Sequence, residues 1–173
     1  MINKEQPNRV RVVGDAFDTR DLRQALSAFG TGVTVVTTLD ADARPVGVTA
    51  NSFNSVSLEP PIVLWSLRKA SPSLPAFDAC GRFVINVLTL DQVPISQRFA
   101  SRLGEKFAGL EFDSGVGGVP LLAGCCARFQ CRNTVRHAGG DHVVFISEVV
   151  DFDRAEERLP LLYFGGAYRK LRA

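Results

Sequence analysis

The sequence predicts a mainly β fold, an antiparallel barrel with peripheral helices. Residues 32–39 form a continuous β-branched and apolar run, which is typical of a buried strand. Residues 127–152 read as two long strands joined by a glycine-containing turn, which is the pattern of a hairpin. The predicted strands do not alternate regularly with crossover helices, and this disfavours a doubly wound parallel sheet.

The chain opens with a polar segment, residues 1–17, which we expect to be a flexible arm ahead of one domain of residues 18–173. Asp18 or Thr19 can cap a first helix. Its apolar residues recur at the spacing i, i+3, i+4, i+7 of an amphipathic helix: Leu22, Ala25, Leu26 and Phe29. Two glycines stop this helix: Gly30 and Gly32.

A hairpin and a third strand follow the first helix. The β-branched run covers Gly32–Leu39, and the turn-rich segment Asp40–Pro45 then reverses the chain. Val46–Phe53 reads as the returning strand of the hairpin. The pair Pro60-Pro61 interrupts the chain before a third strand over Ile62–Leu67.

Two more helices and a fourth strand occupy the middle of the chain. Ser71 followed by Pro72 is an N-cap with proline at the first helical position, and it predicts a short helix that ends near Gly81. Phe83–Leu88 is the fourth strand. A second amphipathic helix runs over about Asp91–Arg102.

The last third of the chain holds the clearest strand pattern. Residues 104–124 are rich in glycine, which predicts an irregular segment with only short pieces of structure. In Ala127–Val135 apolar or small residues alternate with polar ones, the period of a half-buried strand. The turn 138–141 leads into a second strand over His142–Phe152, and a last strand lies near Leu161–Phe164. These elements bring the total to about seven strands.

The charge balance excludes several classes of partner. Twenty basic and 18 acidic side chains leave a net charge of +2. The basic residues are scattered, so we expect no nucleic-acid partner. No stretch approaches the roughly 18 unbroken apolar residues of a membrane span, and the polar N-terminus lacks the apolar core of a signal peptide. We therefore expect a cytoplasmic protein with no membrane partner.

Common metal and nucleotide signatures are missing from the sequence. The four cysteines form no C-x-x-C pair and only two histidines could join them, so we expect buried, reduced cysteines and no metal site. There is no P-loop, G-x-S-x-G or H-E-x-x-H motif. After Gly30-Thr31-Gly32, Val35 occupies the place of the third glycine of a dinucleotide fingerprint. A nicotinamide cofactor would therefore bind at strand ends, at loops or at a subunit interface.

A polar segment begins in the second half of the predicted returning strand and runs past its end. Residues 49–57 contain six hydroxyl or amide side chains in nine positions. Hydroxyl and backbone N–H groups in such a loop suit a phosphate and the polar edge of a planar ring. Serine and asparagine can equally cap a turn by bonding their own backbone. The composition of the segment leaves both interpretations open.

Several segments, in this order and at this spacing, resemble the short-chain flavin reductase family, the reductase components of two-component flavin monooxygenases. The resemblance covers roughly residues 19–172. The segments that carry it are Phe29–Thr38, Thr49–Phe53 with Pro60-Pro61, and Gly140-Asp141-His142. Others that agree with it are Phe83–Leu88, Glu105-Lys106-Phe107 and Gly166-Ala167-Tyr168.

The resemblance implies an antiparallel, Greek-key-like split β-barrel that binds FMN or FAD, with NADH or NADPH as the reductant. It also implies a homodimer, which delivers reduced flavin to a separate oxygenase. No residue is expected to act as an acid or a base, because the hydride passes directly from nicotinamide C4 to flavin N5. The protein stacks and positions the two rings. Backbone N–H groups near residues 49–52 would stabilise negative charge on the flavin ring.

The resemblance also places eleven residues at the cofactor site. Four of them would line the edge of the isoalloxazine ring: Thr49, Ala50, Asn51 and Ser52. Three are candidates for the ribityl and phosphate end: Ser55, Ser66 and Ser71. Lys106 and Phe107 would complete the pocket, His142 matches a histidine associated with nicotinamide binding, and Tyr168 would close the site.

Each of these assignments has a plainer alternative. His142 could be a strand-end histidine that bonds Asp141, and Lys106 could be a solvated surface charge. Phe107 and Trp65 could be core residues, and Tyr168 could be a packing anchor. The glycine-rich segment 104–124 could be a mobile flap over the flavin or an ordinary surface loop.

Two other functions fit the same barrel. One is a flavin- or haem-binding carrier or sensor without enzymatic activity, which would have no need of a nicotinamide site. The other is an oxidase that acts on a small amine through tightly bound FMN. That oxidase should carry more arginine and lysine at the phosphate pocket than the sequence allows us to place.

Overall fold

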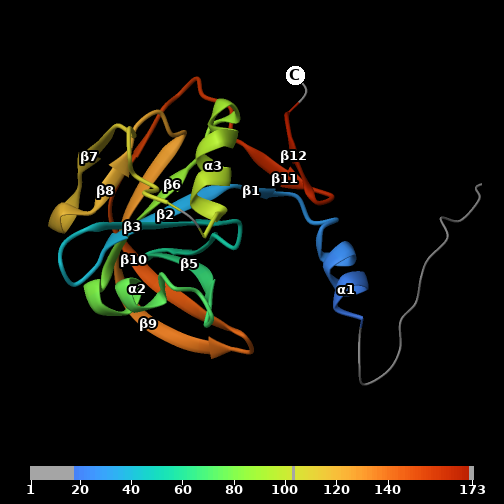
Figure 1. The fold of residues 1–173 in the computed structure, drawn as a ribbon, viewed down its shortest axis with the longest axis horizontal. Coiled ribbons are helices and arrows are strands. Elements are labelled where there is room, and N and C mark those ends of the chain that lie inside the picture. The colour runs from blue at the N-terminus through green and yellow to red at the C-terminus, as the bar shows by residue number, and fades with distance from the viewer. Residues whose placement is uncertain (1–17, 103, 172–173) are drawn as a thin grey trace, which may run out of the picture.

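The computed structural model describes residues 18–102 and 104–171, and it is mainly antiparallel β structure with three short α-helices (Figure 1). The predicted fold class is therefore confirmed. The predicted arm, residues 1–17, lies outside the described residues. Within the described ranges, no helix is long and apolar enough to cross a membrane.

A seven-stranded sheet forms the body of the molecule, and every neighbouring pair in it is antiparallel. Its strands, in spatial order, are β3 (Pro45–Ala50), β2 (Thr34–Leu39), β6 (Arg82–Val87), β9 (Ala127–Gly139), β10 (His142–Arg154), β5 (Pro61–Arg68) and β4 (Asn54–Leu58).

The sheet curls back on itself, so that its first strand meets β5, the strand next to the other edge, without forming a ladder. Ser52, just after β3, makes the junction: its Oγ accepts from the N–H of Ser66 on β5 at 2.9 Å and donates to the Ser66 carbonyl at 3.1 Å. A strand ladder would need a row of backbone bonds, and here one serine bridges the gap. The barrel is therefore split along the exposed edge of β3.

The long hairpin β9–β10 is confirmed and is longer than predicted. Its register runs from His142 opposite Gly139 to Arg154 opposite Ala127, with two irregularities that act as bulges. Bulges increase the local twist, which helps a long hairpin follow a curved sheet. β10 also pairs with β5 from His142 to Glu148, so the hairpin links the two halves of the barrel.

Five short strands complete the described structure. β1 (Thr31–Gly32), β11 (Leu162–Phe164) and β12 (Ala167–Arg169) form a small sheet, and β7 (Phe112–Ser114) pairs with β8 (Pro120–Leu122). The pairing of β7 with β8 and the 3-10 turn η2 (Val116–Gly118) fit the short pieces of structure predicted in the glycine-rich segment.

The sequence did not reveal β4 and β12. In β4 the apolar Val56 and Leu58 are exposed, at 54% and 92%, so no hydrophobic period marks a buried face. Such an edge strand exists because β5 offers it a pairing partner.

The helices are α1 (Thr19–Leu26), α2 (Leu74–Cys80) and α3 (Val93–Ala100). The predicted cap of α1 is confirmed, because Asp18 Oδ1 accepts from the N–H of Arg20 at 2.7 Å. α3 begins two residues later than predicted, because Leu90–Gln92 form a 3-10 turn (η1) closed by a capping box between Thr89 and Gln92.

The start of α2 corrects the prediction that Ser71 caps this helix. The helix begins at Leu74, Ser73 stands at the cap position, and Pro75 lies in the first turn. Ser71 instead accepts from the N–H of Ser73 at 3.3 Å, within the preceding turn. The later start places Leu74 and Phe77, three residues apart, on the face that packs against the main core.

That core is built around Trp65 of β5. Its ring stacks on Phe145 of β10 at 4.8 Å between centroids and meets Phe77 and Phe83 edge-on. All four side chains are almost fully buried, so the interpretation of Trp65 as a core residue is confirmed. A second cluster, around Phe99 of α3, fills the space between that helix and the small sheet.

Candidate functional site

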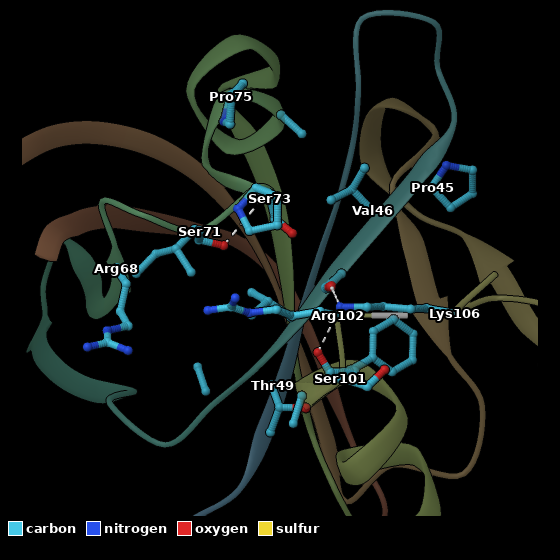
Figure 2. Close-up of a pocket in the computed structure, with 18 of the residues that line it drawn as sticks. Pro45, Val46, Thr49, Arg68, Ser71, Ser73, Pro75, Ser101, Arg102 and Lys106 are labelled. Atoms are coloured by element: carbon cyan, nitrogen blue, oxygen red, sulfur yellow. Dashed lines mark hydrogen bonds between the residues drawn. The ribbon is translucent and has the colours of Figure 1, made fainter. Parts of the chain in front are cut away.

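A cavity of about 930 Å³ opens along the split of the barrel, beside the free edge of β3. Four segments line it: β3 with the loop to residue 52, the end of β5 with the turn to α2, the C-terminal end of α3 with residues 104–107, and the first residue of β10. Figure 2 shows side chains from β3, from the turn before α2 and from the loop after α3 converging on this space.

Nine of the eleven predicted site residues line this one cavity: Thr49, Ala50, Asn51, Ser52, Ser66, Ser71, Lys106, Phe107 and His142. The fold brings them together from four separate parts of the chain. Ser55 and Tyr168 are not among the lining residues. Ser55 lies exposed on β4, and the Tyr168 hydroxyl lies 2.9 Å from Ser96 Oγ in the second core cluster.

Two hydroxyl groups of the polar loop, those of Thr49 and Ser52, bond other parts of the protein. Thr49 Oγ1 donates to the Ser96 carbonyl of α3 at 2.6 Å, and Ser52 Oγ is shared with the backbone of Ser66. These two bonds connect distant segments, whereas Ser57 Oγ accepts from the N–H of Glu59 at 3.2 Å within a local turn. Since β3 is an edge strand, one side of it has no neighbouring strand, and apart from the Gly47 carbonyl, which Lys106 bonds, its backbone groups on that side are open to a ligand in the cavity.

Lys106 brings a positive charge into the cavity without an acidic partner. Its Nζ donates to the carbonyl oxygens of Phe99 at 3.0 Å and Gly47 at 3.5 Å, and no carboxylate of the described residues bonds it. Burial lowers the pKa of Lys106 below its usual value of 10.5. An ammonium held in this way is a ready partner for a phosphate.

Three arginines add to the positive charge of the lining, and the sequence did not single them out for this role: Arg44, Arg68 and Arg102. Arg44 is already paired with Asp40 and Asp42. Within the described ranges, Arg102 makes no ion pair or hydrogen bond. A basic residue at the end of a strand or helix is common, so no signal in the sequence distinguished these three.

His142 is both a strand-end histidine that bonds Asp141 and a lining residue of the cavity. Its Nδ1 lies 2.7 Å from Asp141 Oδ1, as expected of a strand-end histidine, while its ring also lines the cavity. Because a carboxylate accepts hydrogen bonds, Nδ1 is the donor and Nε2 is left for a ligand. The same bond, with the charge of His142 and Arg68, holds the pKa of Asp141 below its usual range.

The backbone around His142 is anchored to β5. The Asp141 carbonyl accepts from the N–H of Lys69 at 2.9 Å, and Lys69 Nζ donates to the Gly140 carbonyl at 2.7 Å. Arg68 lies 3.6 Å from the Asp141 carboxylate. The hairpin tip therefore holds the histidine at the mouth of the cavity.

The cysteines lie away from this site. Burial raises the pKa of Cys125 and of Cys131 to about 12, so both thiols stay protonated near neutral pH. All four cysteines are free, and no group of three or more potential metal ligands occurs among the described residues.

The chemistry of the cavity fits a flavin. An edge strand with free backbone groups can hold the polar edge of a planar ring, and a lysine paired only with carbonyl oxygens can hold a phosphate. The free edge of β3 is lined by Thr49 and Ala50 at its end and by Asn51 and Ser52 directly after it.

Comparisons with known proteins agree with this geometry. Residues 26–172 match the flavin reductase like domain. The chain is 44% identical over 166 residues to the FMN reductase (NADH) SmoA of Agrobacterium fabrum, covering 95% of this chain and 92% of that protein. It is 41% identical to HsaB of Rhodococcus jostii, the reductase subunit of a flavin-dependent monooxygenase, covering 91% of this chain and 80% of that protein.

The fold agrees as well. The structure is similar to the NADH:FAD oxidoreductase SgcE6 of Streptomyces globisporus, with a TM-score of 0.87 and 34% identity, covering 95% of this chain and all of that chain. The family model spans most of the sequence, and the residues that it matches include all nine that line the cavity. The chain therefore belongs to the flavin reductase family.

Proposed function

We propose that this protein is an NAD(P)H:flavin oxidoreductase, which transfers a hydride from NADH or NADPH to FMN or FAD. The observation that carries the proposal is one cavity with three complementary parts. It has a free strand edge for a flavin ring, a lysine without an acidic partner for a phosphate and a histidine at its mouth for the nicotinamide. The similarity to an FMN reductase that uses NADH supports the same activity.

The residues of the chain supply position and charge. When bound, the flavin supplies the electron-accepting ring. Residues 49–52 would hold the edge of that ring, and their backbone N–H groups would stabilise negative charge there. Lys106 would bind the phosphate, with Ser71 beside it. His142, oriented by Asp141, would bind the nicotinamide nucleotide from the mouth of the cavity, so that the two rings stack.

Ser55 and Tyr168 do not line the cavity, and the roles proposed for them are indirect. Tyr168 reaches the site through Ser96, whose hydroxyl it contacts and whose carbonyl accepts from Thr49. It would therefore hold α3 against β3 rather than touch the flavin. Ser55 would contribute only if β4 moved toward the cavity.

The reduced flavin would serve a separate oxygenase in the cytoplasm. The similarity to HsaB, named as the reductase subunit of a monooxygenase, supports this assignment. A reductase of this kind must release its product, and the cavity opens directly to the surface along the split of the barrel.

A homodimer is the proposed assembly. Leu22, Leu26 and Phe29 lie on or just after α1 and are 46%, 65% and 74% exposed, although their spacing is that of a buried face. α1 stands away from the seven-stranded sheet beside β11 and β12 (Figure 1). A second copy of the chain would cover this apolar face.

The proposed activity is tested by following NADH and NADPH oxidation at the nicotinamide absorbance, with and without added FMN or FAD. Oxidation that depends on flavin is the expected result, and it also reveals both cofactor preferences. If flavin-loaded protein oxidised neither nucleotide, the reductase proposal would fall, and a carrier or an amine oxidase on the same barrel would replace it.

A further inference from the structure

We propose that Lys106 is a covalent modification site, where its amine forms a reversible imine with an aldehyde that carries a phosphate group. The proposal goes beyond hydride transfer and does not depend on it, because it concerns the reactivity of one side chain and not the two cofactors. A lysine of this kind needs an unprotonated amine with an open lone pair, and a neighbouring cation to hold the anionic reagent.

The hydrogen bonds of Lys106 leave one direction at Nζ open. Nζ lies 3.0 Å from the carbonyl oxygen of Phe99 and 3.5 Å from that of Gly47, and no other group of the described residues bonds it. An unprotonated amine has two N–H groups and one lone pair. Since the two carbonyl oxygens accept the two N–H groups, the lone pair takes the remaining direction. Lys106 lines the cavity, so this lone pair is open to a ligand that enters it.

The surroundings of Lys106 favour the unprotonated amine. Phe99 and Phe107 line the same part of the cavity, and their rings meet edge-on at 5.0 Å between centroids. Burial among these groups lowers the pKa of Lys106, and within the described ranges no carboxylate bonds the ammonium to oppose this effect. At a given pH, a larger share of Lys106 is therefore unprotonated than of an exposed lysine.

The cavity also carries the charge that a phosphate requires. Four basic and two acidic side chains line it, and one of the acids, Asp40, already pairs with Arg44. Arg102 lines the cavity four residues before Lys106, and it makes no ion pair or hydrogen bond within the described ranges. Figure 2 shows Arg102, Ser71 and Lys106 around the same space. A guanidinium binds phosphate with two N–H groups, so Arg102 would hold this group while Lys106 reacts.

The reaction needs no oxidant or reductant. Nζ attacks the aldehyde carbon and forms a C–N bond, which gives a carbinolamine. The carbon–oxygen bond then breaks, and the oxygen leaves as water with the two protons of the amine. The product is a C=N bond, and water reverses the reaction. While it lasts, the adduct occupies the cavity, so phosphorylated aldehydes would block the site reversibly.

The other lysines of the described chain lack this environment. Lys69 and Lys170 are exposed and do not line the cavity. Lys69 Nζ bonds the Gly140 carbonyl at 2.7 Å, at the hairpin tip. Lys69 is therefore an internal control for the reactivity of an ordinary surface lysine in the same molecule.

The test uses pyridoxal 5′-phosphate and pyridoxal, which differ by the phosphate. The full chain without flavin is treated briefly with each aldehyde at the same concentration, and sodium borohydride reduces the imine to a stable secondary amine. Peptide mass spectrometry then gives the ratio of labelled Lys106 to labelled Lys69. Because both lysines meet the same reagent, this ratio cancels the different intrinsic reactivities of the two aldehydes.

Selective labelling by the phosphorylated aldehyde is the expected result. With pyridoxal 5′-phosphate, Lys106 should be labelled about tenfold more than Lys69, and with pyridoxal this preference should fall severalfold. Arg102→Gln should lower the ratio for pyridoxal 5′-phosphate severalfold and leave that for pyridoxal unchanged. Arg23→Gln is the matched control, because Arg23 lies exposed on α1 and outside the cavity lining, and it should change neither ratio.

Three outcomes would overturn the proposal. Equal labelling of Lys106 and Lys69 by pyridoxal 5′-phosphate is one, and it requires no variant to fold. The same ratio with both aldehydes is the second, since the phosphate would then make no contact. The third is a ratio that R102Q and R23Q change equally or not at all. Failure of the proposed function is a separate result, because the peptide masses are measured without flavin or nicotinamide nucleotide.

Discussion

At the scale of single residues, Lys106 shows how the fold changes the chemistry of a side chain. In the sequence it is one of 20 basic residues, and only the resemblance carried by Glu105-Lys106-Phe107 marks it as a site residue. In the structure its ammonium is partly withdrawn from water against two carbonyl oxygens, and burial lowers its pKa. A negatively charged ligand would offset this desolvation, which is why the lysine is expected to bind phosphate.

The pH dependence of flavin affinity tests this role. Only protonated Lys106 attracts a phosphate, so affinity should be highest below the lowered pKa and should fall as the pH rises through it, earlier than for a lysine with a pKa of 10.5. Lys106→Met should weaken flavin binding by about tenfold or more near neutral pH, and this difference from wild type should shrink as the pH rises through the lowered pKa of Lys106. Lys106→Arg should remove the alkaline decline, because arginine stays charged. An equally steep decline in K106R would assign the titration to another group.

The pair Asp141 and His142 gives a second prediction at the same scale. Asp141→Ala would free the imidazole to rotate and to change tautomer, so we expect the Michaelis constant for NADH to rise severalfold while kcat and flavin affinity change little. Asp141→Asn retains an oxygen acceptor for Nδ1 and should rescue part of this loss. Steady-state kinetics with varied NADH measure both variants. A matching loss of flavin affinity would show that the tip residues support the whole cavity instead.

The direction in which the pKa of Asp141 is shifted predicts how the affinity for NADH responds to acid. A lowered carboxyl pKa means that the bond to His142 persists as the pH falls to the usual value of 3.8 and is lost only below it. A wild-type rise in the Michaelis constant for NADH on mild acidification would therefore have to come from a group other than Asp141.

At the scale of elements, the contact between β3 and α3 holds the ring end of the cavity in place. Thr49 bonds the Ser96 carbonyl, and Gly47 lets the strand approach the helix closely. A Cβ atom at Gly47 would lie 2.5 Å from Cε1 of Phe99 and 3.3 Å from Cζ of Phe107. The position of Lys106, which bonds the carbonyls of Gly47 and Phe99, depends on this approach.

Gly47→Ala should therefore both destabilise the protein and weaken flavin binding. Overpacking of this kind costs about 1–3 kcal/mol, because neither aromatic ring can retreat from a packed cluster. Gly32→Ala is the matched control, since a Cβ atom there would meet no other segment within 4 Å and its backbone is not left-handed. Denaturant unfolding compares the two. Equal stabilities would show that β3 can shift away from α3 at little cost.

A buried asparagine illustrates how the strands are held together beneath the site. Asn86 of β6 donates to the Val35 carbonyl at 3.0 Å and accepts from the N–H of Leu122 at 2.9 Å. Strands β2, β6 and β8 thus share one side chain. Asn86→Leu would leave the Leu122 N–H without this acceptor, whereas the Val35 carbonyl keeps its place in the strand ladder, and we expect a loss of about 1–3 kcal/mol in chemical denaturation. A near-neutral variant would mean that water takes over these bonds.

At the scale of the whole molecule, the apolar face of α1 connects the fold to its assembly. The N–H of Gly165 bonds the Ser27 carbonyl, so the end of α1 is fastened to the small sheet and cannot fold freely onto the barrel. Leu26 and Phe29 remain largely exposed in the single chain. Burial of these side chains would favour association by the hydrophobic effect.

Charge on this face should abolish the proposed dimer. We expect the double variant with Leu26→Glu and Phe29→Glu to sediment as a monomer, while Gln24→Glu, an exposed polar position on the same helix, should leave the wild-type mass unchanged. Sedimentation velocity gives the mass directly. A wild type that is itself monomeric, or a double variant that still dimerises, would move the interface elsewhere or remove it.

Much of the fold could be predicted because its patterns are local. The β-branched run before Asp40 and the polar–apolar alternation after Ala127 each specify a strand without reference to other segments. β4 and the late start of α2 were not predictable in this way. The edge strand forms only where β5 accepts it, and α2 starts where its apolar residues reach the core of Trp65.

The same distinction between local patterns and tertiary contacts applies to the candidate site. The sequence by itself determined the long strands, the polar loop at residues 49–57 and the histidine after the Gly-Gly-Asp turn, because composition and order along the chain carry these signals. Only the tertiary structure decided that Lys106 lacks an acidic partner, that Arg102 lines the same cavity, and that the hydroxyls of Thr49 and Ser52 bond other segments of the protein. Hydrogen bonds and charge compensation depend on which distant segments meet, and here that is set by the curl of a seven-stranded sheet.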